Sequence, residues 1–134
     1  MEMRNGRTDG PLPLDGRKIL LVEDEYLIAE DVAAVLREAG GEVIGPASSL
    51  PMAVRLTEQS ALIDAAVLNI DLQGVAVYPL ADELLGRGVP FLFLTGYGED
   101  QIPDNYSGIR CCNKPVSAGS LLNEVRGLLR LVAS

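Results

Sequence analysis

The chain has 134 residues, 48% of them hydrophobic, which fits one globular domain and argues against an intrinsically disordered chain. Its formal net charge of −8 argues against binding to nucleic-acid phosphates or to an anionic membrane surface. It contains no histidine, which excludes a Cys/His zinc site and the commonest general base.

Residues 1–16 lack the apolar stretch of a signal peptide and predict a flexible lead-in, so we expect the domain to span residues 17–134. No apolar run is long enough to span a bilayer. The neighbouring Cys111 and Cys112 cannot readily pair with each other. We therefore expect a cytoplasmic protein with two reduced thiols, one of them packed in the core.

Short apolar runs alternate with segments whose apolar residues recur at helical spacing. Strands are expected at residues 18–22, 42–45, 65–68, 90–94 and 109–112. Helices are expected over residues 28–39, 51–59 and 121–129. A further helix is expected after residues 69–74, with Pro79 in its first turn and its end near Gly86 and Gly88. Pro46 is expected to end the second strand, and Ser48 or Ser49 to cap the helix after it. Residues 97–107 are poor in helix formers and predict a short or irregular helix that is more mobile than the rest.

The alternation of strand and helix predicts an α/β fold, with a doubly wound parallel sheet covered by helices on both faces. In such sheets the functional site lies beyond the carboxyl ends of the strands. Polar residues follow four of the expected strands there: Glu23 and Asp24, Asn69, Thr95, and Lys114. Carboxylates beside an amide oxygen suit Mg²⁺, whereas a hydroxyl and an ammonium group suit a phosphoryl group.

These residues, in this order and spacing, resemble the response-regulator receiver family from Arg17 to the end of the chain. Lys114 is followed by Pro115, which the family typically has after a cis bond. Residues 93–97, Phe-Leu-Thr-Gly-Tyr, are similar to the FAT GUY motif of an alphaproteobacterial receiver subgroup with a reduced fourth helix. The resemblance implies a flavodoxin-like (βα)5 fold with strand order 2-1-3-4-5 and the first and last helices on one face.

The resemblance also implies a bacterial single-domain response regulator in a two-component phosphorelay. Such a domain is not an enzyme in the usual sense, because it catalyses only its own phosphorylation and dephosphorylation. The implied partner is a histidine kinase or a phosphotransfer protein. The chain ends at Ser134, soon after the last expected helix, so we expect output through contact with a further protein rather than with nucleic acid or membrane.

Site roles follow from the same resemblance. Asn69 stands at the phosphoacceptor position, and Thr95 and Lys114 face the phosphoryl group. The implied magnesium ligands are Glu23, Asp24, Asn69 and the backbone carbonyl of Asp71.

The acceptor position departs from the family pattern, because the family has Asp where this chain has Asn69. An amide cannot form an acyl phosphate. Three explanations stay open. The domain works without standard phosphorylation as a pseudo-receiver that binds other proteins, Asp71 serves as a surrogate acceptor, or Asn69 is a substitution that blocks acceptance while keeping the shape. With one carboxylate fewer, we expect Mg²⁺ to bind more weakly.

A second departure is Cys111, three residues before Lys114, where the family often has a Tyr or Phe that moves on activation. A thiol cannot fill the space of a ring. Tyr97 or Tyr106 could replace that ring, although an exposed loop tyrosine is the simpler expectation for both.

A different class of protein, a small flavodoxin-like enzyme or nucleotide-binding domain, needs a glycine-rich or hydroxyl-rich loop after the first strand. The acidic run at residues 23–25 would instead repel phosphate, which disfavours this class.

Overall fold

The computed structural model describes residues 12–96 and 102–133, and its centre is a five-stranded parallel sheet. The strands of this sheet are β1 (Lys18–Val22), β2 (Glu42–Ala47), β3 (Ala65–Asn69), β6 (Phe91–Thr95) and β7 (Arg110–Asn113). Their order is β2-β1-β3-β6-β7, and every neighbouring pair is parallel. The predicted fold class and strand order are therefore confirmed.

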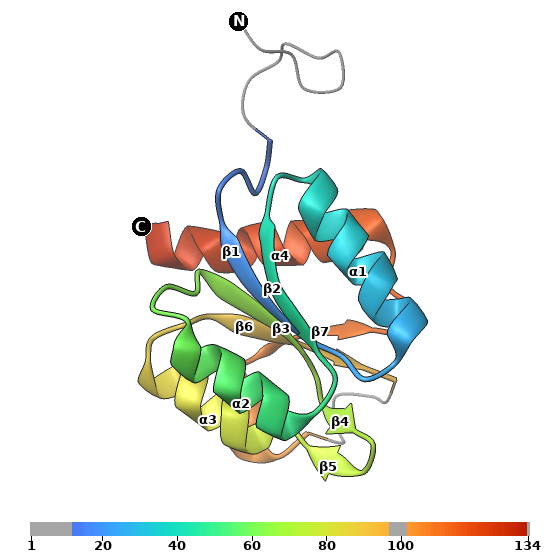
Figure 1. Ribbon diagram of the computed structural model, residues 1–134, viewed down its shortest axis with the longest axis vertical. Helices are drawn as coiled ribbons and strands as arrows, with labels where there is room; N and C mark the ends of the chain where they lie inside the picture. The colour runs from blue at the N-terminus through green and yellow to red at the C-terminus, as the bar shows by residue number, and fades with distance from the viewer. Residues whose placement is uncertain (1–11, 97–101, 134) are drawn as a thin grey trace, which may run out of the picture.

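Two helices cover each face of the sheet (Figure 1). On one face, α1 (Tyr26–Glu38) and α4 (Ala118–Ala133) pack together, and α2 (Leu50–Gln59) and α3 (Tyr78–Gly86) pack together on the other. The first and last helices thus share a face, as predicted. Ser49 caps α2 by accepting a hydrogen bond from Met52 N at 3.3 Å.

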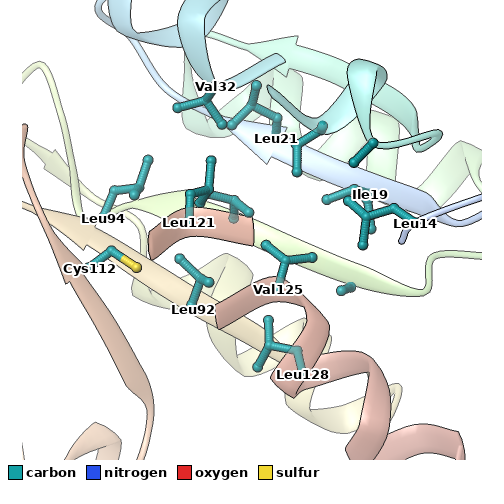
Figure 2. Close-up of a cluster of buried hydrophobic side chains, with 14 of the residues drawn as sticks. Leu14, Ile19, Leu21, Val32, Leu92, Leu94, Cys112, Leu121, Val125 and Leu128 are labelled. Carbon is teal, nitrogen blue, oxygen red and sulfur yellow. The ribbon is translucent and has the colours of Figure 1, made fainter. Parts of the chain in front are cut away.

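The core consists of two clusters separated by the sheet. Along β1, Ile19 and Leu21 point into the α1/α4 cluster, whereas Leu20 and Val22 point into the α2/α3 cluster. Because both faces are covered, the strand is a continuous apolar run rather than an alternating one. Figure 2 shows the α1/α4 cluster, where aliphatic side chains from the strands meet α4 and Cys112 packs among them.

The predicted end of the second strand is wrong, because β2 continues through Pro46 to Ala47. β2 is an edge strand, where a residue without a backbone N–H costs no hydrogen bond to a second neighbour. The β1–β2 register shifts between Leu20 and Val22, and Glu23 N then donates to Ala47 O at 2.9 Å. This bond connects the edge strand directly to the start of the acidic run.

Packing begins before Arg17. Leu14 lies in the segment predicted to be a flexible lead-in, yet its side chain is fully buried in the α1/α4 cluster. Its backbone N–H donates to Ala39 O at 2.8 Å, which holds residues 12–16 against the end of α1.

Between β6 and β7 the described chain contains one 3-10 turn, Asp104–Tyr106, in place of a regular helix. Residues 97–101 of the predicted irregular segment lie outside the described residues, and its mobility stays a prediction. After β3, the short strands β4 (Asp71–Leu72) and β5 (Val75–Ala76) form a hairpin. No helix in the described ranges has the length and apolar character needed to cross a membrane.

Candidate phosphoacceptor site

The polar residues predicted from the strand ends gather at the carboxyl edge of the sheet. Asp24, Asn69, Asp71 and Lys114 line one hollow of about 320 Å³ together with Glu25, Gln73 and Gly96. Glu23 lies beneath it and is 1% exposed, because it directly follows the buried strand β1. The parallel topology thus brings together residues that are up to 91 positions apart, from Glu23 to Lys114.

Asn69 is the last residue of the fully buried strand β3 and is itself 6% exposed. Its side-chain Nδ2 donates to Glu23 Oε2 at 3.0 Å and to Asp24 Oδ1 at 2.9 Å. A third contact, at 2.8 Å, goes to the backbone carbonyl oxygen of Asp71. The amide therefore joins the end of β3 to the acidic run after β1 and to the β4–β5 hairpin.

Lys114 reaches the same acidic run from the other side. Its Nζ lies 2.9 Å from Glu23 Oε1 and 3.0 Å from Glu25 Oε1, and its side chain is only 15% exposed. Glu23 Oε1 receives no hydrogen bond of regular geometry from the described residues, so its contact with the ammonium group is an ion pair. The peptide bond between Lys114 and Pro115 is cis, as the family resemblance implied.

Burial and ion pairing act in opposite directions on these two groups. Burial raises the pKa of Glu23, although Lys114 and the backbone N–H of Glu25 pull it back down. Burial disfavours the charged form of Lys114, but its contacts with Glu23 and Glu25 outweigh this, and the pKa of Lys114 is raised. The ion pair thus favours the charged form of both groups, whereas burial opposes it.

Thr95 ends β6 and is 2% exposed. Its backbone carbonyl accepts a hydrogen bond from Lys114 N at 2.9 Å, which fixes the start of the β7–α4 connection. Gly96, the next residue, lines the hollow. Thr95 therefore stands at the edge of the site, beside the lysine that the family pattern pairs with it.

Asp71 presents its backbone, not its side chain, to Asn69. The Asp71 carboxylate is exposed and accepts a hydrogen bond from Gly74 N at 2.7 Å, inside the β4–β5 turn. That turn has positive φ angles at Gln73 (57°) and Gly74 (88°), which suit a tight two-residue hairpin. The Asp71 carboxylate is thus engaged within the turn, whereas its backbone carbonyl contacts Asn69.

Sequence reasoning missed the place of Tyr106, which was expected to be an exposed loop residue and is 5% exposed. Its ring stacks on Tyr78 at 4.7 Å and meets Phe93 edge-on at 6.1 Å. Its hydroxyl donates to Asp82 Oδ1 at 2.5 Å. Tyr97, the other tyrosine considered, lies outside the described residues. The burial of Tyr106 depends on contacts between its loop and α3, and no periodic pattern in the sequence predicts these contacts.

Cys111 lies next to this ring cluster, because it is the register partner of Phe93 and packs against the same α2/α3 core. Neither Cys111 nor Cys112 forms a disulfide bond, and Cys112 on the opposite face of β7 is buried, as predicted. Burial raises the pKa of Cys112 to about 11.

No protein-family model matches the chain, but relatives and solved structures do. It is 31% identical over 84 residues to the transcriptional regulatory protein PdtaR of Mycobacterium tuberculosis, which covers 62% of this chain and 40% of PdtaR. The chain thus spans about 40% of the length of the curated relatives it matches.

Two of the similar solved structures match over nearly their whole length. SdrG from Sphingomonas melonis Fr1 is 30% identical, with 84% of this chain and 96% of SdrG covered and a TM-score of 0.75. The receiver domain of the hybrid histidine kinase CckA is 26% identical, with 84% and 98% covered and a TM-score of 0.70. With the strand order and the gathered site, these matches show that the chain belongs to the receiver-domain family of response regulators.

Proposed function

We propose that this chain is a receiver module of a two-component pathway that signals by protein contact and does not accept a phosphoryl group at position 69. The observation that carries this proposal is Asn69 at the end of β3, where its amide faces Glu23 and Asp24. An amide oxygen is a poor nucleophile and cannot form the acyl phosphate that an aspartate forms.

The other groups of the site are engaged with one another. Lys114, which would otherwise face a phosphoryl group, pairs with Glu23 and Glu25. A site whose ammonium group is already paired with two carboxylates supports a domain held in one state. The partners we propose are a histidine kinase or phosphotransfer protein and a downstream protein, in a cytoplasmic bacterial pathway. The net charge of −8 speaks against nucleic acid.

Phosphoryl acceptance on Asp71 is the second candidate, and the hairpin geometry speaks against it. The Asp71 carboxylate holds the Gly74 N–H at 2.7 Å, and only its backbone carbonyl is directed toward Asn69. To act as an acceptor, the side chain would have to leave the turn that it stabilises.

Incubation with acetyl phosphate and magnesium chloride, followed by intact-mass spectrometry, tests the proposal. The present chain should stay unmodified, and Asn69→Asp should gain one phosphoryl group, because Thr95 and Lys114 are already in place. The double variant Asn69→Asp/Asp71→Asn is the matched control and should still be modified. A phosphoryl group on the unaltered chain, at Asp71 or elsewhere in this site, would overturn the proposal.

A further inference from the structure

The side-chain nitrogen of Asn69 lies within 3.0 Å of three oxygen atoms that belong to three separate positions: Glu23, Asp24 and the carbonyl of Asp71. All three atoms can only accept hydrogen bonds here, because two are carboxylate oxygens and one is a backbone carbonyl. The amide oxygen in that place would face three acceptors without a proton between them. The hydrogen-bond network therefore assigns the NH₂ group, not the carbonyl, to this point.

These three oxygens are the atoms assigned, on the family resemblance, to a magnesium ion. The prediction that Asn69 is itself an oxygen ligand does not agree with this arrangement, because its NH₂ group stands where the other ligands converge. A cation at that point would have to displace the NH₂ group and turn the amide, at the loss of all three contacts. As they stand, these residues do not fit a metal ion.

We propose that the Asn69 amide takes the place of a divalent cation, so that the site keeps its arrangement without metal. Its two N–H groups, one of them shared between two acceptors, tie the end of β3 to the acidic run and to the β4–β5 hairpin. The inference rests on the proposed function in one respect only, namely that Asn69 is no acceptor.

Burial makes this replacement effective. Glu23 is 1% and Asn69 6% exposed, so water supplies few alternative donors for the buried carboxylate. Lys114 is already shared between Glu23 and Glu25, which leaves the Asn69 amide as the donor to Asp24 Oδ1. Each carboxylate of the acidic pair thus has a partner from within the chain.

Calorimetric titration with Mg²⁺, and with Mn²⁺ followed by electron paramagnetic resonance, tests the inference on the full chain, Asn69→Ala and Asn69→Asp. We expect affinity to rise in that order, with Asn69→Ala roughly three-fold and Asn69→Asp at least about ten-fold tighter than the present chain. Asn69→Ala is the decisive variant, because it removes a potential oxygen ligand but also the NH₂ group that fills the site. If Asn69→Ala binds Mg²⁺ no more tightly than the present chain, the inference is wrong.

Gln59→Glu is the matched control for charge. It adds one carboxylate on the exposed last turn of α2, at the opposite end of the fold from the hollow, and should bind Mg²⁺ as the present chain does. An affinity gain equal to that of Asn69→Asp would show that net charge, not the site, governs binding.

Thermal unfolding of the present chain and of Asn69→Asp supplies a second measurement. The melting temperature of the present chain should be the same in a chelator and in excess magnesium chloride, whereas that of Asn69→Asp should rise by several degrees with magnesium. A metal-stabilised present chain would overturn the inference even if it takes up no phosphoryl group. A phosphorylated present chain would instead overturn the proposed function, so the two failures are distinguishable.

Discussion

Two positions of this chain depart from the receiver pattern, and the contacts around them differ in kind. At the end of β3, Asn69 stands for an aspartate, and its amide contacts the acidic pair with hydrogen bonds. In β7, Cys111 stands for an aromatic residue, and the ring of Tyr106 enters the same core from the β6–β7 connection. At the first position the substituted residue itself makes the hydrogen bonds, and at the second a ring from another segment lies in the same core.

The difference lies in what each replacement must satisfy. Around Asn69 the requirement is hydrogen-bond donors for three acceptor oxygens, and a small, neutral NH₂ group with fixed geometry supplies them. Around Cys111 the requirement is side-chain volume, because a thiol is smaller than an aromatic ring. The ring of Tyr106 lies in this core, stacks on Tyr78 and donates its hydroxyl to Asp82. Substitutions in the two regions should therefore differ in how much they lower the free energy of unfolding and in how this loss depends on pH.

The largest expected effect is that of Tyr106→Ala. Removal of a buried ring that contacts Tyr78 and Phe93 should lower the free energy of unfolding by about 3–5 kcal/mol. Urea denaturation measures the loss, and Tyr26→Ala is the control, since Tyr26 is 74% exposed and should change stability little. If both substitutions lower the free energy of unfolding equally, the contacts of Tyr106 with Tyr78 and Phe93 do not stabilise the fold more than an exposed tyrosine does.

The next effect concerns the polar region. Asn69→Leu keeps the volume but removes the donors to Glu23 and Asp24, and should cost about 1–3 kcal/mol at neutral pH without metal. Since burial already raises the pKa of Glu23, loss of the donor should raise it further. The variant then loses stability as pH rises through that pKa, so the difference between the two proteins should narrow below about pH 4 to the share that comes from the lost contact with the Asp71 carbonyl.

Measurement of unfolding free energies from acid to neutral pH checks this prediction. The cost of Tyr106→Ala relative to Tyr106→Phe, neither of which keeps the hydroxyl bond to Asp82, should stay constant over the same acid range, because packing does not titrate there. If the cost of Asn69→Leu does not change with pH, the Asn69 amide stabilises the fold by packing, as the Tyr106 ring does. The two regions would then not differ in the way proposed.

Cys111→Phe tests whether Tyr106 occupies the volume that a ring at position 111 would need. Alone it should overpack the core and cost about 1–3 kcal/mol. In the background of Tyr106→Ala it should cost less or stabilise, which gives a coupling energy of about 0.5–3 kcal/mol in a double-mutant cycle. Strict additivity would show that the two side chains do not share one space.

The smallest effect is that of Tyr106→Phe, which keeps the ring and removes the bond to Asp82, at a cost of about 1 kcal/mol at neutral pH. The hydrogen bond to Asp82 and burial both raise the pKa of Tyr106 above its ordinary value of 10.0. The contribution of this hydrogen bond to stability is complete at pH values below the ordinary tyrosine pKa of 10.0 and is lost as pH rises through the raised pKa of Tyr106.

The stability difference between the present chain and Tyr106→Phe should thus shrink in alkaline solution, as chemical denaturation at several pH values would show. Tyr26→Phe is the control, since Tyr26 is 74% exposed. If the stability difference persists unchanged at alkaline pH, the protonated Tyr106 hydroxyl is not the group that stabilises the fold.

Much of the architecture follows from local patterns in the sequence. Apolar runs such as residues 65–68 are strands because both faces of a parallel sheet are covered, and residues 118–133 form a helix because their apolar residues recur at helical spacing. The polar residues at the strand ends could be placed at one edge for the same reason, since parallel strands end on the same side. The resemblance to the receiver family implied that Asn69 stands where the family has an aspartate.

Only the tertiary structure decided how these residues satisfy one another. The sequence cannot tell which end of the Asn69 amide faces the acidic pair, because that depends on three acceptors converging from positions 23, 24 and 71. Nor can it show that β2 continues through Pro46, which depends on β2 being an edge strand. Tyr106 is the clearest case. Its loop has no periodic pattern, and its burial depends on α3 and β6, which lie far from it in the sequence and close to it in the fold.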